Sequence, residues 1–444
     1  MANNRMNEYP YEIHEIYELF KDYPRLCTDS RKLIPDSIFF ALKGANFDGN
    51  SFVEQALQQG CAFALTDDPA MARIPGSIFV NDVQTALQQL AALHRRMLAV
   101  PMLMITGTNG KTTTKELTKA VLLQKYSITA TEGNLNNHIG LPITLLGMND
   151  NTQFAVIEAG ANHLGEIATL CNIAAPNYGL ITNVGKAHLE GFGSFDGVKT
   201  AKSELYDYLQ QTNGMAFFNA DDHEIVSMID RHPNLRRTAY GASLLQAVGT
   251  IAKDLRLTVN TRNPEMNIST QMAGQYNLNN ILAATAVGLY FGIDIQSIAN
   301  AIEGFRPADN RSQLITDGEN TVIMDAYNAN PSSMTAAVNN FAALEGKKIA
   351  ILGDMLELGN EADREHRSIL ELADSKELKQ IMLVGQNFAA AAKTVKVNTP
   401  LKVFKNKEDI LNYLRDNPPK GFTILVKASH GIALDALDKV LLSN

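Results

Sequence analysis

A glycine-rich segment at residues 107–113 combines the residue types that bind phosphate groups. Glycines let backbone N–H groups close around phosphate oxygens, a lysine reaches the outer phosphates, and a hydroxyl can bind Mg²⁺. The segment reads Gly107, Thr108, Asn109, Gly110, Lys111, Thr112 and Thr113. An apolar run precedes it and a helical pattern follows it, which is the context that a phosphate loop requires. The alternative, a turn with an exposed lysine, fits that context less well.

Two further residues follow apolar runs in which strands are expected. Glu158 follows the run 154–157, and His188 lies shortly after the run 178–182. Ligands of open α/β sheets collect at the carboxyl ends of the strands, where a carboxylate can hold Mg²⁺ opposite the phosphate loop. A loop histidine is more often simply solvated, but the matching position of Glu158 favours a role for His188 in the same site.

Lys202 lies on the apolar face of an expected helix at residues 198–209. Val198, Lys202, Leu205 and Leu209 share one face at helical spacing. One interpretation is a lysine whose stem covers apolar surface while its ammonium reaches water. The other is a desolvated, nucleophilic amine that reacts with CO₂ to form a carbamate, which is a metal-binding anion. Helical periodicity permits both.

The elements that must position these residues begin with a small mixed α/β unit in the first hundred residues. Its expected strands are 37–42 and 76–80, and its expected helices are 51–59 and 83–98. The second helix ends in basic residues, which suit a helix C-terminus, and Pro101 follows. We place the first domain boundary there.

A long α/β region follows. Its expected strands are 101–106, 154–157 and 178–182, and its expected helices include 112–124, 198–209 and 278–291. Such alternation implies parallel strands with crossover helices. A proline at position 307, followed by Asp309, Asn310 and Arg311, marks a hinge or linker.

The last third of the chain alternates still more regularly. Its expected strands are 321–324, 348–352, 380–384, 401–404 and 422–426, with helices between them and a last helix at 433–442. This pattern predicts a doubly wound sheet of its own. The fold class is therefore α/β, with three domains: a small mixed N-terminal domain, a central phosphate-loop domain with a parallel sheet, and a Rossmann-like C-terminal domain.

Composition restricts the functional class. The 444 residues suggest about three domains, and the formal charge of −8 argues against a general nucleic-acid or anionic-membrane binder. Three cysteines cannot form a disulfide framework in so long a chain. The polar, acidic N-terminus predicts no signal peptide, and no apolar run approaches the roughly 18 residues that a membrane span needs. These features predict a cytoplasmic enzyme.

The phosphate loop is compressed, because only Thr108 and Asn109 separate its first glycine from the Gly-Lys pair. This form resembles the ATP-dependent Mur ligases of bacterial cell-wall synthesis and their folylpolyglutamate synthetase relatives. Residues 198–204 resemble the Mur ligase segment that carries a carbamylated lysine, at the position of Lys202. The resemblance implies ATP and two Mg²⁺ ions as cofactors, with Thr112, Glu158, His188 and the carbamylated Lys202 as metal ligands.

Residues 275–280 resemble the family's Asn-x-x-Asn adenine-binding signature. This resemblance implies that Asn277 and Asn280 lie near the base. Asparagine also caps helix starts, so a capping role is the alternative interpretation, and both roles can hold at once.

Further segments resemble the Mur ligases that add D-alanyl-D-alanine to a UDP-MurNAc-tripeptide. They are residues 28–31, 39–44, 48–49, 132–142, 325–331 and 352–359. The resemblance spans essentially the full chain and implies a UDP-substrate domain at 1–98, an ATP-binding domain at 99–308 and a dipeptide-binding domain at 309–444. It implies UDP-substrate contacts at Ser30, Arg31, Lys43, Asn137 and His138, dipeptide contacts at Tyr327, Asn328 and Asn330, and ATP contacts at Arg311 and Asp325.

The implied reaction begins when ATP phosphorylates the terminal carboxylate of the tripeptide. The amine of D-alanyl-D-alanine then attacks the acyl phosphate, giving an amide, ADP and phosphate. Asp325, at an expected strand end, could accept a hydrogen bond from a ribose hydroxyl. Arg311 resembles the third-domain arginine that reaches the γ-phosphate, although it could also be an exposed linker charge. The implied partners are small molecules, and we predict a monomer without membrane insertion.

One departure and two rival interpretations remain. The family usually has Lys-Gly-Ser-Arg near the C-terminus, whereas this chain has Lys427, Ala428, Ser429 and His430, and histidine cannot copy a bidentate arginine. Residues 406–409 match the guanine-reading Asn-Lys-x-Asp pattern of GTPases, although a helix N-cap explains them better. Residues 416–419 lack the arginine of the Asp-Asn-Pro-Arg motif used by Mur ligases that add diaminopimelate.

Overall fold

The computed structural model describes residues 10–307 and 310–442. Asp309 of the expected hinge and the predicted boundary between residues 308 and 309 lie outside the described residues. The chain divides into two compact units. The first comprises Met1–Met104, Tyr126–Ala161 and Gly165–Tyr178, and the second comprises Ile105–Lys125, Asn162–Leu164 and Gly179–Asn444. The limits of the three expected domains stay a prediction.

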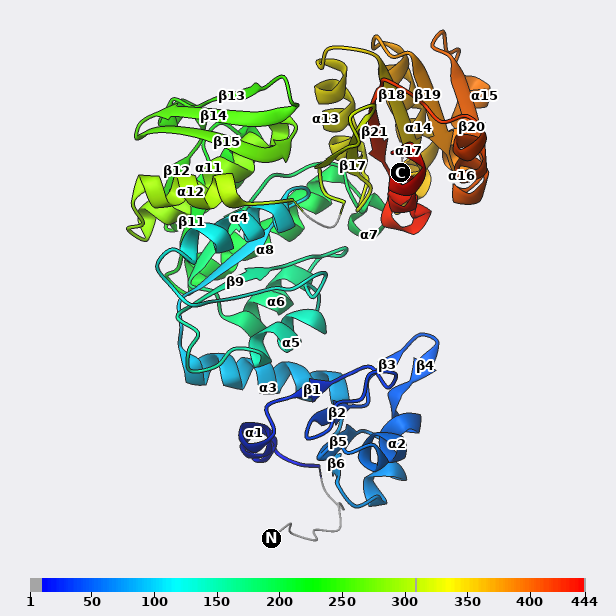
Figure 1. The fold of residues 1–444 in the computed structure, drawn as a ribbon. Helices are drawn as coiled ribbons and strands as arrows, with labels where there is room; N and C mark the ends of the chain where they lie inside the picture. Colours follow the sequence, from blue (N-terminus) through cyan, green and yellow to red (C-terminus); the bar gives the residue numbers. More distant parts are fainter. Residues whose placement is uncertain (1–9, 308–309, 443–444) are drawn as a thin grey trace. The chain divides into compact units, whose positions relative to one another are not determined.

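The N-terminal part of the first unit contains a four-stranded parallel sheet in the order β1-β2-β5-β6 (Figure 1). Its strands are β1 (Leu26–Cys27), β2 (Ile38–Phe40), β5 (Phe63–Thr66) and β6 (Ser77–Phe79), and β3 (Lys43–Gly44) and β4 (Phe47–Asp48) form a separate hairpin. The helices are α1 (Ile13–Asp22), α2 (Val53–Gln58) and α3 (Val83–Leu98), with 3-10 turns η1 (Gly49–Phe52) and η2 (Met71–Arg73). The predicted helix at 83–98 is confirmed to the residue, because Asp82 caps its start and Ala99 ends it in a left-handed conformation.

The remainder of the first unit belongs to the α/β region. It holds β8 (Ile128–Ala130), α5 (Gly140–Leu146), β9 (Phe154–Glu158) and α6 (Glu166–Ala174), and β8 pairs with β9 in parallel. All five residues of β9 are buried, which explains the uninterrupted apolar run that precedes Glu158. Six strands of the region are ordered β12-β11-β10-β7-β9-β8 in one sheet.

The α/β part of the second unit carries the phosphate loop. Its strands are β7 (Met102–Thr106, which begins in the first unit), β10 (Tyr178–Ile181), β11 (Met215–Asn219) and β12 (Arg236–Tyr240). Its helices are α4 (Lys111–Leu122), α7 (Leu189–Phe192), α8 (Phe195–Gln211), α9 (His223–Ile229), α10 (Ala242–Leu245), α11 (Leu278–Tyr290) and α12 (Ile295–Gly304), with the turn η3 (Gln275–Asn277). Helix α11 packs against α4, so the adenine-signature segment and the phosphate loop belong to one packed layer.

An antiparallel three-stranded sheet interrupts the α/β alternation before α11. It consists of β13 (Val248–Ile251), β14 (Arg256–Arg262) and β15 (Glu265–Ala273), paired in that order. The expectation of parallel strands throughout this region is therefore wrong here. Strict alternation of buried and exposed residues along β14 and β15 shows a sheet with only one covered face.

The C-terminal part of the second unit is a six-stranded sheet in the order β16-β17-β21-β18-β19-β20. All pairs are parallel except the edge pair β16–β17. The strands are β16 (Gln313–Thr316), β17 (Thr321–Asp325), β18 (Lys348–Gly353), β19 (Gln380–Val384), β20 (Leu401–Phe404) and β21 (Thr423–Lys427). The helices are α13 (Pro331–Ala342), α14 (Ala362–Asp374), α15 (Gln386–Thr394), α16 (Lys407–Asp416) and α17 (Asp438–Leu441), with turns η4 (Gly359–Glu361), η5 (His430–Ile432) and η6 (Leu434–Leu437).

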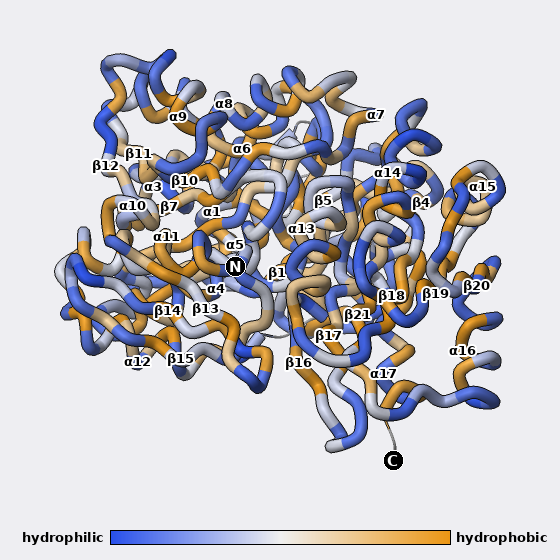
Figure 2. Tube along the Cα trace, turned by 90° about the horizontal axis from the view of Figure 1, so that it is seen from above, coloured by the Kyte–Doolittle hydropathy of each residue, from blue (hydrophilic) through white to orange (hydrophobic). Residues whose placement is uncertain are grey.

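Helices cover both faces of this sheet, as a doubly wound fold requires. Ala350 and Leu352 of β18 join the core formed with α13, α14 and α15, whereas Ile349 and Ile351 join the core formed with α16 and α17. Figure 2 shows the apolar runs of β17 and β21 between these layers. The predicted α/β class with a Rossmann-like C-terminal sheet is confirmed. The predicted helix at 433–442 is confirmed only in part, because Ala433 is left-handed, the 3-10 turn η6 follows it, and the α-helix α17 begins only at Asp438.

The cysteine prediction is confirmed, since Cys27, Cys61 and Cys171 are all free and buried. Among the helices that the structure describes, none has the length and apolar character that crossing a membrane requires.

Candidate active site

The phosphate loop connects the end of β7 to the first residue of α4. Gly107 and Gly110 have positive φ angles of 139° and 78°, which a side chain rarely allows. A Cβ atom on Gly107 would lie 2.0 Å from the Thr182 hydroxyl, and one on Gly110 would lie 2.5 Å from the amide oxygen of Asn280. Both glycines are therefore required by close packing as well as by backbone conformation.

The residues that follow β10 hold this loop in place. The backbone N–H of Asn109 donates to the Asn183 side chain at 3.0 Å, and the Thr182 hydroxyl donates to the Asn109 carbonyl at 2.7 Å. The Thr108 hydroxyl accepts a hydrogen bond from the Gly185 N–H at 2.9 Å. A loop fixed in this way is preorganised, which lowers the entropic cost of binding a phosphate.

The side chain of Lys111 turns back onto the phosphate loop. Its ammonium donates to the carbonyl oxygens of Gly107 and Thr108 at 2.8 and 3.1 Å. The side chain of Thr112 is in the first turn of α4, and the residue is 7% exposed. The N-terminus of α4, the two glycines and an ammonium at the loop mouth give the chemistry of a triphosphate site.

Asn277 and Asn280 lie at the start of α11 and are both buried. The Asn280 amide donates to the Asn277 oxygen at 2.9 Å and its oxygen accepts from the Thr114 hydroxyl at 3.1 Å, so α11 is tied to α4. The Asn277 amide donates backward to the Ala273 carbonyl at 2.7 Å. The alternative of a capping side chain is wrong for Asn277, because η3 precedes α11 directly and no side-chain cap forms.

His188 and Lys202 lie close to the phosphate loop on the same unit. His188 precedes α7 with a φ of 49°, and its Nδ1 contacts a carboxylate oxygen of Glu357. Burial lowers the pKa of His188, Glu357 opposes this effect, and the charges of Lys111 and Lys202 add to the lowering. The imidazole is therefore favoured in its neutral form, which is the form that binds metals.

Lys202 is 2% exposed, and the predicted buried helix face is confirmed, since Val198, Leu205 and Leu209 are buried beside it on α8. Its ammonium lies 5.4 Å from the ring centroid of Phe192. An ammonium so deeply buried is not the snorkelling lysine of the alternative interpretation, because its head group does not reach water.

Glu158 belongs to the first compact unit, where it ends β9 and is 2% exposed. The Asn136 amide donates to its Oε1 at 2.8 Å, and its own N–H donates to the Thr131 hydroxyl at 2.9 Å. Asn136 was not singled out as a functional residue, although it lies in the segment 132–142. Within the described residues, no cluster of three or more His, Cys, Asp or Glu side chains is arranged to hold a metal.

The residues expected at the UDP substrate also lie in the first unit. Arg31 forms a bidentate ion pair with Asp29. The hydrogen bonds from Arg31 lower the pKa of Asp29 to about 2. Lys43 of the β3–β4 hairpin pairs with Asp67 at 2.8 Å. Burial alone would raise the pKa of Asp67, but Lys43 and Asn50 lower it below its usual range. Asp67 was missed, because four elements, from β4 to β5, separate it from Lys43 along the chain.

The other residues expected at the UDP substrate have different positions. Asn137 uses its side-chain oxygen to accept the backbone N–H groups of Ile139 and Gly140 at 3.1 and 2.8 Å, which orders the entry to α5. The side chain of His138 is exposed, and its carbonyl accepts from the Gln88 amide of α3 at 3.0 Å. Ser30 is partly exposed beside the Asp29–Arg31 pair.

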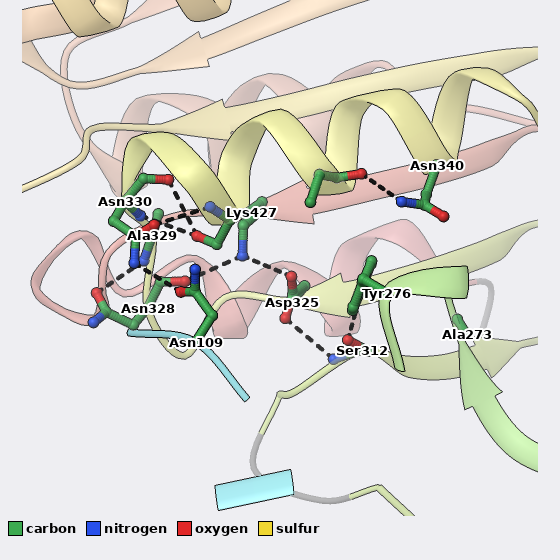
Figure 3. A network of polar contacts seen from close by, with 12 residues as sticks. Asn109, Ala273, Tyr276, Ser312, Asp325, Asn328, Ala329, Asn330, Asn340 and Lys427 are labelled. Carbon is green, nitrogen blue, oxygen red and sulfur yellow. Dashed lines mark hydrogen bonds and ion pairs between the residues drawn. The ribbon is translucent and has the colours of Figure 1, made fainter. Parts of the chain in front are cut away.

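A charged network lies at the carboxyl end of the C-terminal sheet (Figure 3). The Lys427 ammonium pairs with Asp325 at 2.6 Å and donates to the Asn328 carbonyl at 3.2 Å. The second oxygen of Asp325 accepts the Ser312 N–H at 3.2 Å, and the hydroxyls of Ser312 and Tyr276 share a hydrogen bond of 2.6 Å. Burial, and secondarily the charge of Asp325, raises the pKa of Tyr276, so this hydroxyl stays protonated.

Asn330 connects the C-terminal sheet to the phosphate loop. Its amide nitrogen donates to the Asn109 side chain at 2.8 Å, and its oxygen accepts the Ser333 N–H at 2.9 Å, which caps α13 (Figure 3). Asn328 accepts its neighbour's N–H, that of Ala329, at 2.8 Å. The sequence had grouped Asn328 and Asn330 as equivalent, whereas only Asn330 contacts the phosphate loop among the contacts described.

Arg311, at the start of the C-terminal part, stacks on the ring of Tyr327. Its guanidinium carbon lies 3.4 Å from the centre of the Tyr327 ring, and its Nε is buried without a hydrogen-bond partner among the described residues. The ring of His430 lies 5.8 Å from that of Tyr327. A buried guanidinium N–H without a partner fits an incoming anionic oxygen. The interpretation of Arg311 as an exposed linker charge is wrong.

Two acidic residues of the C-terminal part contact the α/β part of the same unit. Glu357 pairs with His188, and Glu365 pairs with Lys186 at 2.9 Å. The Ser332 hydroxyl accepts the Lys186 N–H at 2.9 Å. Of the two acidic residues, only Glu357 lies in a segment that the sequence analysis had marked, namely 352–359. Asn406 caps α16 by accepting the Asp409 N–H at 3.0 Å, so the helix-cap interpretation of residues 406–409 is confirmed.

Comparison with known families matches the chain in three adjoining segments. Residues 23–104 match the Mur ligase family catalytic domain, residues 105–288 the Mur ligase middle domain, and residues 310–430 the Mur ligase glutamate ligase domain. The UDP-N-acetylmuramoyl-tripeptide--D-alanyl-D-alanine ligase of Bacillus subtilis is 36% identical over 432 residues, covering 94% of this chain and 93% of that protein.

Solved structures give the same relationship. MurF from Acinetobacter baumannii matches with a TM-score of 0.84 and 30% identity, covering 98% of this chain and 99% of that one. MurF ligase from Thermotoga maritima, solved in complex with ADP, shares the fold with a TM-score of 0.83 at 24% identity, covering 94% and 96% of the two chains.

Proposed function

The chain belongs to the Mur ligase family, and from that premise we propose that it joins D-alanyl-D-alanine to a UDP-MurNAc-tripeptide at the expense of ATP. The observation that carries the proposal is the packed site around residues 107–113, in which Lys111, His188 and Lys202 lie close enough to influence one another electrostatically. Relatives over nearly the whole chain bear the name of this ligase.

The phosphate loop would hold the triphosphate of ATP. Its backbone N–H groups would donate to the phosphates, and the ammonium of Lys111, which now donates to the carbonyls of Gly107 and Thr108, would turn to phosphate oxygens. The buried amides of Asn277 and Asn280, which are tied to α4 through Thr114, would bind the base. Arg311, with its unpartnered Nε, would stabilise charge that develops during transfer of the γ-phosphoryl group.

We propose that the enzyme uses two Mg²⁺ ions. Thr112 would bind one ion, and Glu158, His188 and a carbamylated Lys202 would bind the other. The ions supply charge neutralisation between the carboxylate of the tripeptide and the triphosphate. A neutral imidazole is the form that binds a metal, and burial lowers the pKa of His188 in that direction. Lys202 is 2% exposed, and its carbamate would supply an anionic ligand.

The chain's own residues would order the reaction in two stages. The carboxylate oxygen attacks the γ-phosphorus, the bond to the β-phosphate oxygen breaks, and ADP leaves. The amine of the dipeptide then attacks the acyl carbon, phosphate leaves, and the amine loses a proton to form the amide. Ser30, Arg31, Lys43, Asn137 and His138 would bind the UDP substrate, and Tyr327, Asn328 and Asn330 would bind the dipeptide, while Asp325 would accept a ribose hydroxyl.

The test is phosphate release from ATP with UDP-MurNAc-tripeptide, measured with and without D-alanyl-D-alanine. We expect release that requires both substrates and is absent with GTP. Release with a free amino acid in place of the dipeptide would move the chain to a sibling ligase. Comparing tripeptides that end in lysine and in diaminopimelate would then define the third residue of the substrate.

We propose further that the enzyme is a cytoplasmic monomer. Its proposed substrates are small, soluble nucleotide-linked precursors, and the free, buried cysteines suit a reducing compartment. Light scattering coupled to size-exclusion chromatography should give a mass near 48.5 kDa.

A further inference from the structure

Lys427 is a buried lysine that the proposed chemistry does not use. It ends β21 and is 2% exposed, and it stands in register with Asp325 at the end of the adjacent strand β17. Burying an ammonium is costly unless it is paired and hydrogen-bonded. Lys427 meets this condition with the Asp325 carboxylate at 2.6 Å and the Asn328 carbonyl at 3.2 Å (Figure 3).

One partner of Lys427 lies on the nucleotide side of the proposed site. Asp325 is held from the opposite direction by the Ser312 N–H, and Ser312 is held in turn by Tyr276, which lies in η3 immediately before α11. A carboxylate has about four lone-pair positions, so Asp325 can accept a further hydroxyl while it keeps both contacts. Without the ammonium, it would be a fixed negative charge beside a triphosphate.

The other partner of Lys427 lies on the proposed dipeptide side. Asn328 follows Tyr327, and the two residues after it are fixed: Ser429 donates to the Ala329 carbonyl at 3.1 Å, and Asn330 contacts Asn109. The hydrogen bond from Lys427 to the Asn328 carbonyl therefore fixes the orientation of the peptide group that follows Tyr327 and Asn328.

We propose that Lys427 is a positioning residue that couples the ATP site to the dipeptide site. One ammonium orients Asp325 for the ribose and orients the loop 327–330 for the dipeptide. Its loss should therefore weaken the binding of both ATP and the dipeptide. This inference rests on the proposed function. A purely structural lysine that fastens two strand ends would change stability without changing the apparent affinity for either substrate.

Lys348 provides a matched control in the same sheet. It is 6% exposed at the start of β18, and its ammonium donates to the carbonyls of Ala342 and Leu344 at 2.5 and 2.7 Å. Within the described residues it forms no ion pair. Lys348→Met therefore removes a buried, hydrogen-bonded ammonium from this sheet away from Asp325 and Asn328.

The experiment measures KM for ATP and for D-alanyl-D-alanine in three single variants, Lys427→Met, Asp325→Asn and Lys348→Met. It also measures both values in the double variant that combines Lys427→Met with Asp325→Asn. Lys427→Met should raise both KM values about tenfold, which is the effect of losing one charge-assisted hydrogen bond. Asp325→Asn should raise only the KM for ATP. In the double variant the KM for ATP should be no higher than in the worse single variant, because both changes disrupt one interaction.

Lys348→Met should keep both KM values within about twofold while lowering the melting temperature. Equal KM changes in Lys427→Met and Lys348→Met, or no KM change in Lys427→Met, would overturn the coupling role. If Lys427→Met does not fold, Lys427→Arg keeps the charge but changes its geometry. It should then raise the KM for the dipeptide more than that for ATP, and an unchanged dipeptide KM would overturn the proposal. Wild-type protein that releases no phosphate with both substrates would instead refute the proposed function.

Discussion

The phosphate loop and the Lys427 network both lie in the second compact unit, but they are encoded differently. The loop is a run of seven neighbours, residues 107–113. The network joins Tyr276, Ser312, Asp325 and Lys427, whose outer members are 151 positions apart, from Tyr276 at position 276 to Lys427 at position 427. Local backbone geometry creates the first site, whereas the second exists only when the order of strands in the sheet is correct.

This difference has an energetic consequence. The loop depends on backbone conformation and close packing, so a single methyl group can damage it. The network depends on the pairing of two buried charges, those of Lys427 and Asp325. Removing one of them leaves the other buried without an opposite charge, which is destabilising. Variants in the first region should therefore act mainly on ATP, whereas loss of Lys427 in the second region should act on both ATP and the dipeptide.

The largest effect is expected for the loop lysine. Lys111→Ala should lower kcat/KM for ATP by about a thousandfold, because it removes the cation that faces the transferred phosphoryl group. The measurement is phosphate release with both substrates present at saturating Mg²⁺.

Lys119→Ala is the control for that substitution. Lys119 lies on the same helix with its side chain 35% exposed and forms a loose surface pair with Glu116 at 3.9 Å. Its replacement should leave activity within about twofold. If Lys111→Ala were as active as Lys119→Ala, residues 107–113 would not be the catalytic nucleotide site.

Lys202→Ala should have the next largest effect, about a hundredfold in kcat, because it removes a proposed metal ligand. Added formate or acetate should restore part of the activity, since a small carboxylate can take the place of the carbamate. Lys199→Ala, on the same helix but paired with Asp196 and Glu224, should not respond to these anions. Full activity of Lys202→Ala at saturating Mg²⁺ would show that the carbamate role is wrong.

A smaller effect is expected from Gly107→Ala, which tests the packing of the loop. Its new Cβ would lie 2.0 Å from the Thr182 hydroxyl, so the loop must shift. We expect a loss of about 2 kcal/mol in local stability and a raised KM for ATP. Gly304→Ala at the end of α12 meets no atom within 4 Å and should change neither quantity appreciably. Similar behaviour of the two variants would contradict the packing argument.

The parts of the fold that could be predicted are those governed by short-range pattern. The helix at 83–98 and the strands at 380–384 and 401–404 appear with the expected bounds, and the loop lies between β7 and α4 as its spacing required. The last helix is shorter than predicted because Ala433 adopts a left-handed conformation. An alanine gives no sign of this conformation in the sequence. The strands β14 and β15 carried a readable period-two pattern that was overlooked.

The candidate site shows the same limit. Burial of Lys202 followed from helical spacing, because its neighbours on that face are apolar. The sequence did not predict which residues pair with the charged and titratable side chains. The unpredicted partners are Asp67 for Lys43, Glu357 for His188, Glu365 for Lys186 and Lys427 for Asp325. Each pair depends on long-range topology, and many acidic residues would have been equally acceptable from sequence alone.

The smallest expected effect separates two asparagines that cap helices in the C-terminal part. Asn330 and Asn406 both accept an N–H three residues later, at 2.9 and 3.0 Å. Replacing either by alanine should cost about 1 kcal/mol of helix stability, measurable as a small fall in melting temperature. Only Asn330 also donates to Asn109 of the phosphate loop among the contacts described.

Asn330→Ala should therefore raise the KM for ATP by about threefold to tenfold beyond its effect on stability, as expected for one hydrogen bond. Asn406→Ala should leave that KM unchanged and should not alter the preference for ATP over GTP, because its side chain serves only as a cap in the described structure. Equal KM values in the two variants would mean that the Asn330–Asn109 contact does not couple the C-terminal sheet to the loop. A changed nucleotide preference in Asn406→Ala would instead revive the guanine-reading interpretation of residues 406–409.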